Sequence, residues 1–372
     1  MDHPGNRGIL NKMEYQRAAF SELTETSDSI CNSIRGPLRN GEALGEYTFT
    51  GRGFDSLNHY FVFYFHVARQ LASTRYDFLY VRYPLAIPGF LGLLRAAKRA
   101  NPRMRIVIEI ATFPYRRELE GFKRGVLRTF DDLGHGQLKR YADLIVTFYG
   151  QSEIFGVPCM QLSNGVDVSQ LPRRAKSTGG AAFSMVVVGN LAPRHGIDRV
   201  LRGMSDYLAT RAGASERDLV LHVVGVGPST DELRALTAEL RLDEHVHFHG
   251  LKSGEALDEV FDQADVALDS LAIHRLQLPR SSSLKAREYC ARGIPFVLAS
   301  EDADFPERLK FVHRVPASED PLDIRALIDF HARLGRETDA LVDEIRAYAE
   351  AHLTWKAKLS PLVDYLRRET HG

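Results

Sequence analysis

A run of three serines, followed by a lysine and a glutamate at helical spacing, is the clearest chemical signal in the chain. Serines at a helix start offer unpaired backbone N–H groups and hydroxyls that suit a pyrophosphate, and a lysine in the first turn adds positive charge. The glutamate, one turn further along, is placed to accept hydrogen bonds from ribose hydroxyls. The alternative interpretation is an ordinary N-cap with a solvated glutamate. The residues are Ser281, Ser282, Ser283, Leu284, Lys285 and Glu288.

A second group of candidate binding residues lies in a loop that joins a predicted strand to a predicted helix. This loop begins at Gly189 and Asn190. Such loops lie at the carboxyl edge of a parallel sheet, where ligands bind, and the N-terminus of the following helix favours an anion. Arg194 and His195 stand where a diphosphate would meet them. The alternative is that Gly196 only turns the chain and that Arg194 is solvated.

A glycine-rich turn follows the next predicted strand, in the segment Val223-Val-Gly-Val-Gly-Pro228. Gly225 and Gly227 allow the backbone to approach a ligand closely. The turn lacks the third glycine of a dinucleotide-binding fingerprint, which argues against NAD. We expect it to fit a base or a ribose rather than to cradle a phosphate.

Short apolar runs alternate with segments of helical spacing, and this alternation predicts the parallel sheets of an α/β protein. A chain of 372 residues is long enough for two α/β domains of similar size. The aperiodic segment 172–180 predicts a linker, after which the pattern restarts as a second doubly wound domain. Strands are predicted at residues 78–82, 105–110 and 144–148 in the first half, and at 183–188, 219–224, 246–249, 266–268 and 295–298 in the second.

Composition limits the class of protein. With 44% hydrophobic and 26% charged residues the chain is an ordinary globular one. Its three cysteines, Cys31, Cys159 and Cys290, are scattered without CxxC spacing, which argues against a disulfide framework or a structural zinc site. No apolar run approaches a membrane span, and the first residues do not form a signal peptide. These features predict a cytoplasmic protein.

Basic residues concentrate between residues 91 and 130, although the net charge of the chain is zero. Ten lysines and arginines stand there against three glutamates. One interpretation is a set of solvated helix faces. The other is attraction to anionic lipid headgroups or to a phosphorylated acceptor, which would bring the protein to the inner face of the membrane. We expect no nucleic-acid partner, because interleaved aromatics and a recognised binding motif are missing.

Five motifs follow one another in the second half: Gly189-Asn-Leu, His195-Gly-Ile-Asp-Arg, Val224-Gly-Val-Gly-Pro, Val246-His-Phe-His249-Gly250 and Glu288-Tyr-Cys-Ala-Arg-Gly-Ile-Pro295. Their order resembles the donor-binding domain of GT-B glycosyltransferases, specifically the retaining family 4, or glycosyl transferases group 1. The first half looks like bacterial capsule and exopolysaccharide transferases of this family, in the segments Tyr80-Val-Arg-Tyr-Pro84, Ile108-Glu-Ile-Ala-Thr-Phe-Pro-Tyr115 and Leu162-Ser-Asn-Gly-Val-Asp167. The resemblance covers nearly the whole chain.

The resemblance implies a GT-B fold, in which two Rossmann-like doubly wound domains face a cleft. It implies transfer of a sugar from a UDP- or GDP-sugar to a glycan or lipid-linked acceptor, with retention and without a metal or other cofactor, in cell-surface polysaccharide synthesis. The expected organisation is an acceptor-binding domain at residues 1–172, a linker at 173–180, a nucleotide-sugar-binding domain at 181–352, and a terminal helix at 353–372 that crosses back to the first domain.

Roles carry over to individual positions. Glu288 matches the family's ribose-binding glutamate, and the three serines match the loop whose backbone holds the diphosphate. In the same way Gly189, Asn190, Gly225, Gly227, His249, Gly250 and Leu284 are expected on the donor side.

Three positions depart from the family pattern. The first glutamate of the Glu-x7-Glu motif falls on Arg280, and the usual arginine and lysine pair falls on Asn190 and His195. Arg194, a protonated His195 and Lys285 would then have to stabilise the leaving diphosphate. The same departures leave open a non-catalytic GT-B subunit that binds or stabilises a partner transferase. A nucleotide-sugar epimerase is a further alternative.

The first half offers candidates for the acceptor side. The family begins with a strand that leads into a glycine-containing loop, whereas this chain opens inside such a loop, so the first strand of the sheet is expected to be missing. Polar residues cluster after the predicted strand 105–110, where they would face the cleft. The alternative is a loop packed by Phe113 and Pro114. The candidates are Gly8, Lys12, Glu109, Thr112, Tyr115 and Glu118.

Overall fold

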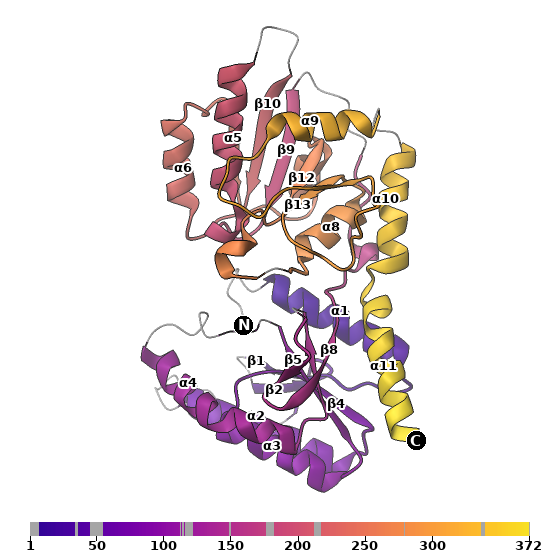
Figure 1. The fold of residues 1–372 in the computed structure, drawn as a ribbon. Coiled ribbons are helices and arrows are strands. Elements are labelled where there is room, and N and C mark those ends of the chain that lie inside the picture. The colour runs from indigo at the N-terminus through magenta and orange to yellow at the C-terminus, as the bar shows by residue number, and fades with distance from the viewer. Residues whose placement is uncertain are drawn as a thin grey trace. The chain divides into compact units, whose positions relative to one another are not determined.

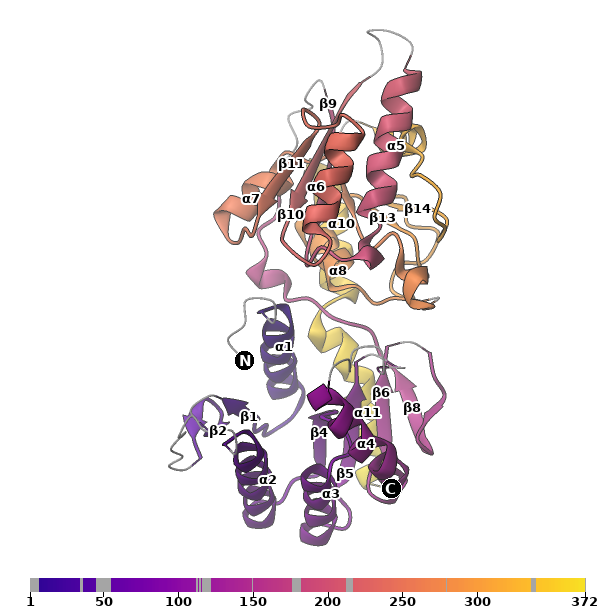
Figure 2. The same ribbon diagram turned by 90° about the vertical axis from the view of Figure 1, so that its left-hand side faces the viewer.

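The computed structural model describes residues 7–33, 36–44, 55–111, 113, 115, 122–148, 150–175, 182–211, 217–278, 280–335 and 339–371. The chain forms two compact units (Figures 1 and 2). Unit 1 comprises residues 1–163 and 359–372, and unit 2 comprises residues 164–358. The chain therefore passes from one unit to the other twice.

Unit 1 is built on a five-stranded sheet in the order β4-β5-β6-β8-β7. Its first four members pair in parallel and only β7 is antiparallel to its neighbour, so the predicted parallel sheet is confirmed. The three strands predicted from apolar runs all form. The strands are β4 (Phe78–Arg82), β5 (Arg105–Ile110), β6 (Leu144–Thr147), β7 (Glu153–Ile154) and β8 (Val157–Gln161).

Helices cover both faces of this sheet. Side chains alternate along β5: Ile106 and Ile108 join the apolar cluster with α2 (Asp55–Ser73) and α3 (Pro88–Ala100), whereas Glu109 points to α1 (Arg7–Leu23). The carboxyl half of α11 (Trp355–His371) also belongs to unit 1. The crossover between β5 and β6 contains α4 (Phe122–Gly134) and the 3-10 helix η3 (His135–Arg140).

The beginning of unit 1 differs from the expectation. Gly8 lies within α1, so its placement in a glycine loop is wrong. Within residues 7–33, 36–44 and 55–77, no strand joins the main sheet; β1 (Ile30–Ser33), β2 (Gly36–Arg39) and β3 (Glu42–Ala43) form a small antiparallel sheet of their own.

Unit 2 is a six-stranded sheet in the order β11-β10-β9-β12-β13-β14, with every neighbouring pair parallel. The order reverses direction beside β9, which is the doubly wound arrangement predicted for this half. The five predicted strands of this half are confirmed, and β14 is added. The strands are β9 (Ala182–Val188), β10 (Asp218–Val224), β11 (Val246–Gly250), β12 (Val266–Leu268), β13 (Phe296–Leu298) and β14 (Val312–Arg314).

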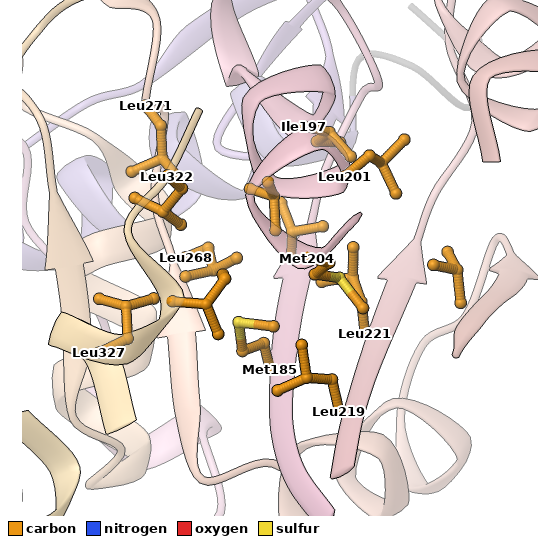
Figure 3. Close-up of a cluster of buried hydrophobic side chains, with 14 of the residues drawn as sticks. Met185, Ile197, Leu201, Met204, Leu219, Leu221, Leu268, Leu271, Leu322 and Leu327 are labelled. Atoms are coloured by element: carbon orange, nitrogen blue, oxygen red, sulfur yellow. The ribbon is translucent and has the colours of Figure 1, made fainter. Parts of the chain in front are cut away.

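Two apolar clusters hold the layers of unit 2 together. Met185 and Val187 of β9 face one layer of helices, whereas Val186 faces the other, which explains why this strand is apolar along its whole length. Figure 3 shows the first cluster, where Met185 and Leu219 meet side chains of α5. This layer comprises α5 (Ile197–Thr210), α6 (Thr230–Glu239) and α9 (Ile324–Arg333), and the opposite layer comprises α7 (Glu255–Asp262), α8 (Leu284–Arg292) and α10 (Asp339–His352).

The first residues of the expected linker pack on unit 2. Arg174 is buried, its backbone N–H bonds to the carbonyl of Arg292, and its guanidinium bonds to the carbonyl of Ala264. Residues 176–180 lie outside the described part of the chain. No helix in the described ranges is both long and apolar enough to cross a membrane.

Candidate functional site

The candidate site of unit 2 lies at the carboxyl edge of its sheet. Loops leave β9, β10 and β12 there, and the N-terminus of α8 meets them. The loop after β9 leads through the 3-10 helix η5 (Pro193–His195) into α5. Because ligands of parallel sheets bind at this edge, and above all where the strand order reverses, the arrangement is that of a binding site.

The glycines of the predicted ligand-binding turns are required by the packing of two loops against each other. A Cβ atom on Gly225, whose φ is +122°, would lie 1.9 Å from the carbonyl oxygen of Gly189. One on Gly227 would lie 2.2 Å from the carbonyl oxygen of Leu191 and 2.4 Å from Oδ1 of Asn190. The sequence predicts a ligand close to these two glycines. In the structure the backbone of the neighbouring loop lies close to both of them.

Lys285 lies at the centre of this edge. Its Nζ is 3.1 Å from the hydroxyl of Ser270 and 3.7 Å from Oδ1 of Asp269, and its side chain runs past Gly189. Burial lowers the pKa of Lys285 to about 8; Asp269 opposes this shift and the positive charge of Arg194 adds to it. The lysine is thus a cation close to its titration point, with one carboxylate beside it.

Arg194 supplies a second positive charge nearby. It is partly buried, and within the described ranges no hydrogen-bond or ion-pair partner holds its guanidinium. Its effect on the pKa of Lys285 and of His195 shows that the three side chains are close enough to interact. The structure therefore brings together Arg194 and Lys285 as predicted, and Asp269 lies beside Lys285.

His195 does not carry the predicted positive charge. Its ring is buried, and Nδ1 accepts a hydrogen bond from the backbone N–H of Ala192 at 3.2 Å. Burial, together with Lys285 and Arg194, lowers the pKa of His195 to about 2. The imidazole is therefore neutral near pH 7, and the expected contribution of a protonated His195 is wrong for this structure.

The three serines are largely engaged by the protein itself. Ser283 caps α8 by accepting the N–H of Lys285 at 3.2 Å, and it donates to Oδ1 of Asp269 at 2.6 Å. The Ser282 hydroxyl accepts the N–H of Asn164 at 2.7 Å, and the N–H of Ser281 bonds to the Glu301 carbonyl at 2.9 Å. The hydroxyls of Ser282 and Ser283 are thus already engaged, and the N-cap interpretation holds for Ser283.

Backbone donors nevertheless remain at the start of α8. Within the described part of the chain, no partner engages the N–H groups of Ser282, Ser283 and Leu284. These donors and the helix dipole provide the anion-binding character expected of this segment.

Glu288 lies on α8 one turn beyond Lys285 and remains partly exposed. Its Oε1 accepts from Nε of Arg292 at 3.0 Å, and Arg292 is bound in turn by Asp258 at 2.6 Å. The carboxylate therefore keeps a defined position with its second oxygen available to a ligand. Arg280, at the position of the family's other glutamate, is exposed and pairs with Glu301.

His249 and Gly250 end β11 beside the glycine turn. The Gly250 carbonyl accepts the N–H of Gly225 at 2.6 Å, which ties the two loops together. Nε2 of His249 lies 3.0 Å from Nδ1 of His222, and burial lowers the pKa of both rings, that of His222 to about 4. His249 thus packs beside the edge as a neutral ring.

Two acceptor-side candidates of unit 1 form a buried ion pair with each other. Nζ of Lys12 is 2.9 Å from Oε1 of Glu109, and these side chains are only 6% and 1% exposed. Gln16 donates to Oε2 of Glu109 at 2.7 Å, and Tyr80 donates to it as well. Although burial raises the pKa of Glu109, Lys12 and these hydrogen bonds outweigh burial and lower it. Glu109 was expected to face the cleft, and this is wrong, because it fastens α1 to the sheet.

Tyr115 is likewise held by a structural partner. Its hydroxyl donates to Oδ2 of Asp131, while Tyr83 and the N–H of Ala86 bind Oδ1. Burial, followed by Asp131, raises the pKa of Tyr115. Thr112 and Glu118 lie outside the described residues.

Asp269 and Ser270 are site residues that the sequence analysis missed. They directly follow β12 and bind Lys285 and Ser283. A polar pair at the carboxyl end of a short apolar strand was the available signal. Within the described ranges, no group of three or more His, Cys, Asp or Glu side chains is arranged to hold a metal ion.

Comparisons with known proteins bear on the fold and on the class of activity. Residues 173–307 match the model of the family described as "Glycosyl transferases group 1". The chain is similar in structure to sucrose-phosphate synthase from Thermosynechococcus elongatus, with 15% identity over 96% of this chain and 92% of that chain and a TM-score of 0.56. It is also similar to Anabaena Alr3699/HepE in complex with UDP-glucose, with 14% identity over 87% and 85% of the two chains and a TM-score of 0.54.

The chain is similar in structure to a glycosyltransferase from Rickettsia africae as well, with 11% identity over 87% of this chain and 83% of that chain and a TM-score of 0.54. No curated protein sequence matches the chain. The matched segment lies within unit 2. The fold is that of the GT-B glycosyltransferases, as predicted. The family match over residues 173–307 supports glycosyl transfer as the activity.

Proposed function

We propose that the chain transfers a sugar from a UDP- or GDP-sugar to a glycan or lipid-linked acceptor, with retention and without a metal ion, in cell-surface polysaccharide synthesis. One observation carries the proposal. Two cations, Arg194 and Lys285, interact at the sheet edge, where Lys285 lies 3.7 Å from the carboxylate of Asp269. Because the unpaired N–H groups at the start of α8 lie on the same helix as Lys285, the edge is suited to a diphosphate. The UDP-glucose held by the similar Anabaena protein is a ligand of this chemical class.

The side chains divide the work between binding and charge stabilisation. The α8 amides hold the diphosphate, and the partly exposed Glu288 receives the ribose hydroxyls. Lys285 and Arg194 stabilise negative charge that grows on the diphosphate as the bond from the sugar carbon breaks, so their effect is largest in the transition state.

In the proposed reaction the acceptor oxygen bonds to the sugar carbon on the face from which the diphosphate departs. The acceptor proton passes to a phosphate oxygen of the leaving group. The bond that forms, the bond that breaks and the proton are then all accounted for, and no protein nucleophile takes part.

One observation favours the alternative of a non-catalytic GT-B subunit. His195 stands where the resemblance implies a lysine, and its ring is neutral. Calorimetry with UDP- and GDP-sugars, followed by donor-consumption assays with and without acceptor lipid, separates the two functions. The transferase requires donor binding and acceptor-dependent turnover that persists in EDTA. Donor binding without turnover over a broad acceptor panel would instead indicate the non-catalytic subunit.

A further inference from the structure

The helix α4 of unit 1 presents three large apolar side chains to solvent. Leu133 is 75% exposed, Phe130 is 47% exposed and Leu127 is 39% exposed. These residues follow one another at intervals of three, so they form a stripe along the helix. The neighbouring α3 does the opposite and buries Phe90, Leu93, Leu94 and Ala97. Figure 1 shows α4 at the periphery of unit 1.

Polar contacts fasten α4 to the unit. Asp131 is 2% exposed and accepts the N–H of Ala86 at 2.7 Å, together with the hydroxyls of Tyr83 and Tyr115. One turn further, Gly134 packs so closely that a Cβ atom would lie 2.0 Å from the carbonyl oxygen of Ala86. The side that carries Asp131 and Gly134 therefore faces the protein, and the apolar stripe belongs to none of the apolar clusters formed by the described residues.

The exposed charges on the described residues of α4 and of the following η3 are mainly positive. Arg128 on α4 and Lys139 and Arg140 on the following η3 are exposed. Asp132 lies near Arg128, with Nε and Oδ2 3.9 Å apart. Asp131 is buried and hydrogen-bonded, so it adds no exposed charge. The described residues of α4 and η3 therefore expose three cations and one carboxylate.

We propose that α4 is an interfacial helix that docks unit 1 on an anionic lipid bilayer. An exposed apolar stripe beside basic side chains matches the layering of such a surface, where acyl chains lie beneath anionic headgroups. The basic composition of residues 91–130 alone did not locate the contact, whereas the burial of Asp131 and the exposure of Leu133 orient it. The inference rests on the proposed function in one respect: docking on the bilayer brings the enzyme to a lipid-linked acceptor.

Fluorescence of an introduced tryptophan tests the contact without removing any packed side chain. The chain has one natural tryptophan, Trp355, which is buried. In Leu133→Trp, vesicles of phosphatidylcholine and phosphatidylglycerol should shift the emission to shorter wavelength, and pure phosphatidylcholine vesicles should do so much less. The matched control is Leu251→Trp in unit 2, at a leucine that is 68% exposed, and its emission should not move.

Sedimentation with the same vesicles measures the strength of the contact. Phe130→Ser with Leu133→Ser should weaken partition by about tenfold or more, because two apolar side chains no longer enter the lipid. Arg128→Ala and added salt should each weaken it further for anionic vesicles. Leu251→Ser should bind as the unmodified protein does.

Two results would overturn the proposal: no emission shift of Leu133→Trp on anionic vesicles, or equal partition of the serine variant and the unmodified protein. Concentration-dependent self-association that the serine substitutions abolish, without vesicle binding, would assign the stripe to a second copy of the chain and equally refute it. Calorimetric affinity for UDP-glucose should be the same in the α4 variants. Because vesicle binding needs no donor, failure of the membrane contact and failure of donor binding are distinguishable.

Discussion

Unit 1 and unit 2 each place a lysine beside a buried carboxylate, yet the two sites have different consequences. In unit 1, Lys12 and Glu109 lie 2.9 Å apart, and two further donors fill the carboxylate. In unit 2, Lys285 lies 3.7 Å from Asp269, and a second cation, Arg194, stands nearby without a partner of its own in the described ranges. The carboxylate of the first site accepts from three side chains, and a second cation, Arg82, acts electrostatically on Lys12 there. In the second site the lysine lies farther from its carboxylate, beside N–H groups of α8 that have no partner in the described ranges.

This difference distinguishes charged residues that hold the fold together from charged residues that can bind a ligand. A buried pair whose hydrogen bonds are complete holds elements together, as Lys12 holds α1 to β5. Positive charge that exceeds its protein partners at a sheet edge is available to an anionic ligand. Substitutions at the two lysines should therefore change different properties of the protein.

The largest effect is expected from Lys12→Met, which leaves Glu109 buried without its cation. Removing one partner of a buried pair costs about 3–5 kcal/mol in the free energy of unfolding. Denaturant unfolding followed by circular dichroism measures this loss. The double variant Lys12→Met/Glu109→Gln should be more stable than Lys12→Met alone, because the unpaired charge is gone. A single variant as stable as the unmodified protein would show that the pair does not hold α1.

Lys285→Ala should leave the fold intact and lower turnover by about 10²-fold, more than it weakens donor affinity. The physical reason is that charge on the leaving diphosphate grows toward the transition state. Single-turnover kinetics with calorimetric affinities in parallel measure both quantities. Lys310→Ala, at an exposed lysine that pairs with Glu344, is the matched control and should be unaffected.

The same lysine predicts a pH dependence. Its pKa in the free protein is lowered to about 8, so it is a cation below that pH and loses its charge as the pH rises through it. The kcat/KM value should therefore fall above about pH 8, and Lys285→Arg should flatten the fall because arginine stays charged. An identical alkaline limb in both proteins would assign the titration to another group.

Glu288→Ala should weaken donor affinity by about 1.5–3 kcal/mol, as expected when a carboxylate no longer accepts from ribose hydroxyls. Thermal unfolding should change little, since Glu288 is partly exposed and its Arg292 partner keeps Asp258. Calorimetry with UDP and with a ribose-lacking pyrophosphate tests the assignment. The substitution should affect only the nucleotide, and an equal loss for both ligands would contradict a ribose contact.

The smallest effect is expected at His195. With a pKa near 2 the ring is neutral throughout the range from pH 6 to pH 9, which was not expected from the sequence. The pH–rate profiles of the unmodified protein and His195→Gln should therefore have the same shape. A titration near neutral pH that disappears in the variant would show that a bound diphosphate recharges the imidazole.

The sequence predicted the features that local pattern determines. Apolar runs identified eight of the eleven strands in the two main sheets but not β7, β8 and β14. A strand buried on two faces is apolar along its length, which makes it visible in the sequence. The sequence did not show that Lys12 pairs with Glu109, because the two are 97 positions apart and only the packing of α1 brings them together. Asp269 was missed for a similar reason: its partners lie on α8, beyond an intervening loop. Gly8 was misplaced because its loop was inferred from the resemblance rather than from the helical spacing of residues 7–23.

The most direct test of the central claim, that the positively charged edge of unit 2 holds the donor diphosphate, is a calorimetric titration with UDP, GDP and their glucose and mannose conjugates. We predict one ligand per chain, with affinity lowered about tenfold or more by Arg194→Ala, because a charge-assisted contact contributes about 1.5–3 kcal/mol. Lys310→Ala should bind as the unmodified protein does. Absence of binding for every nucleotide, or equal affinity of Arg194→Ala, Lys285→Ala and the unmodified protein, would contradict the account.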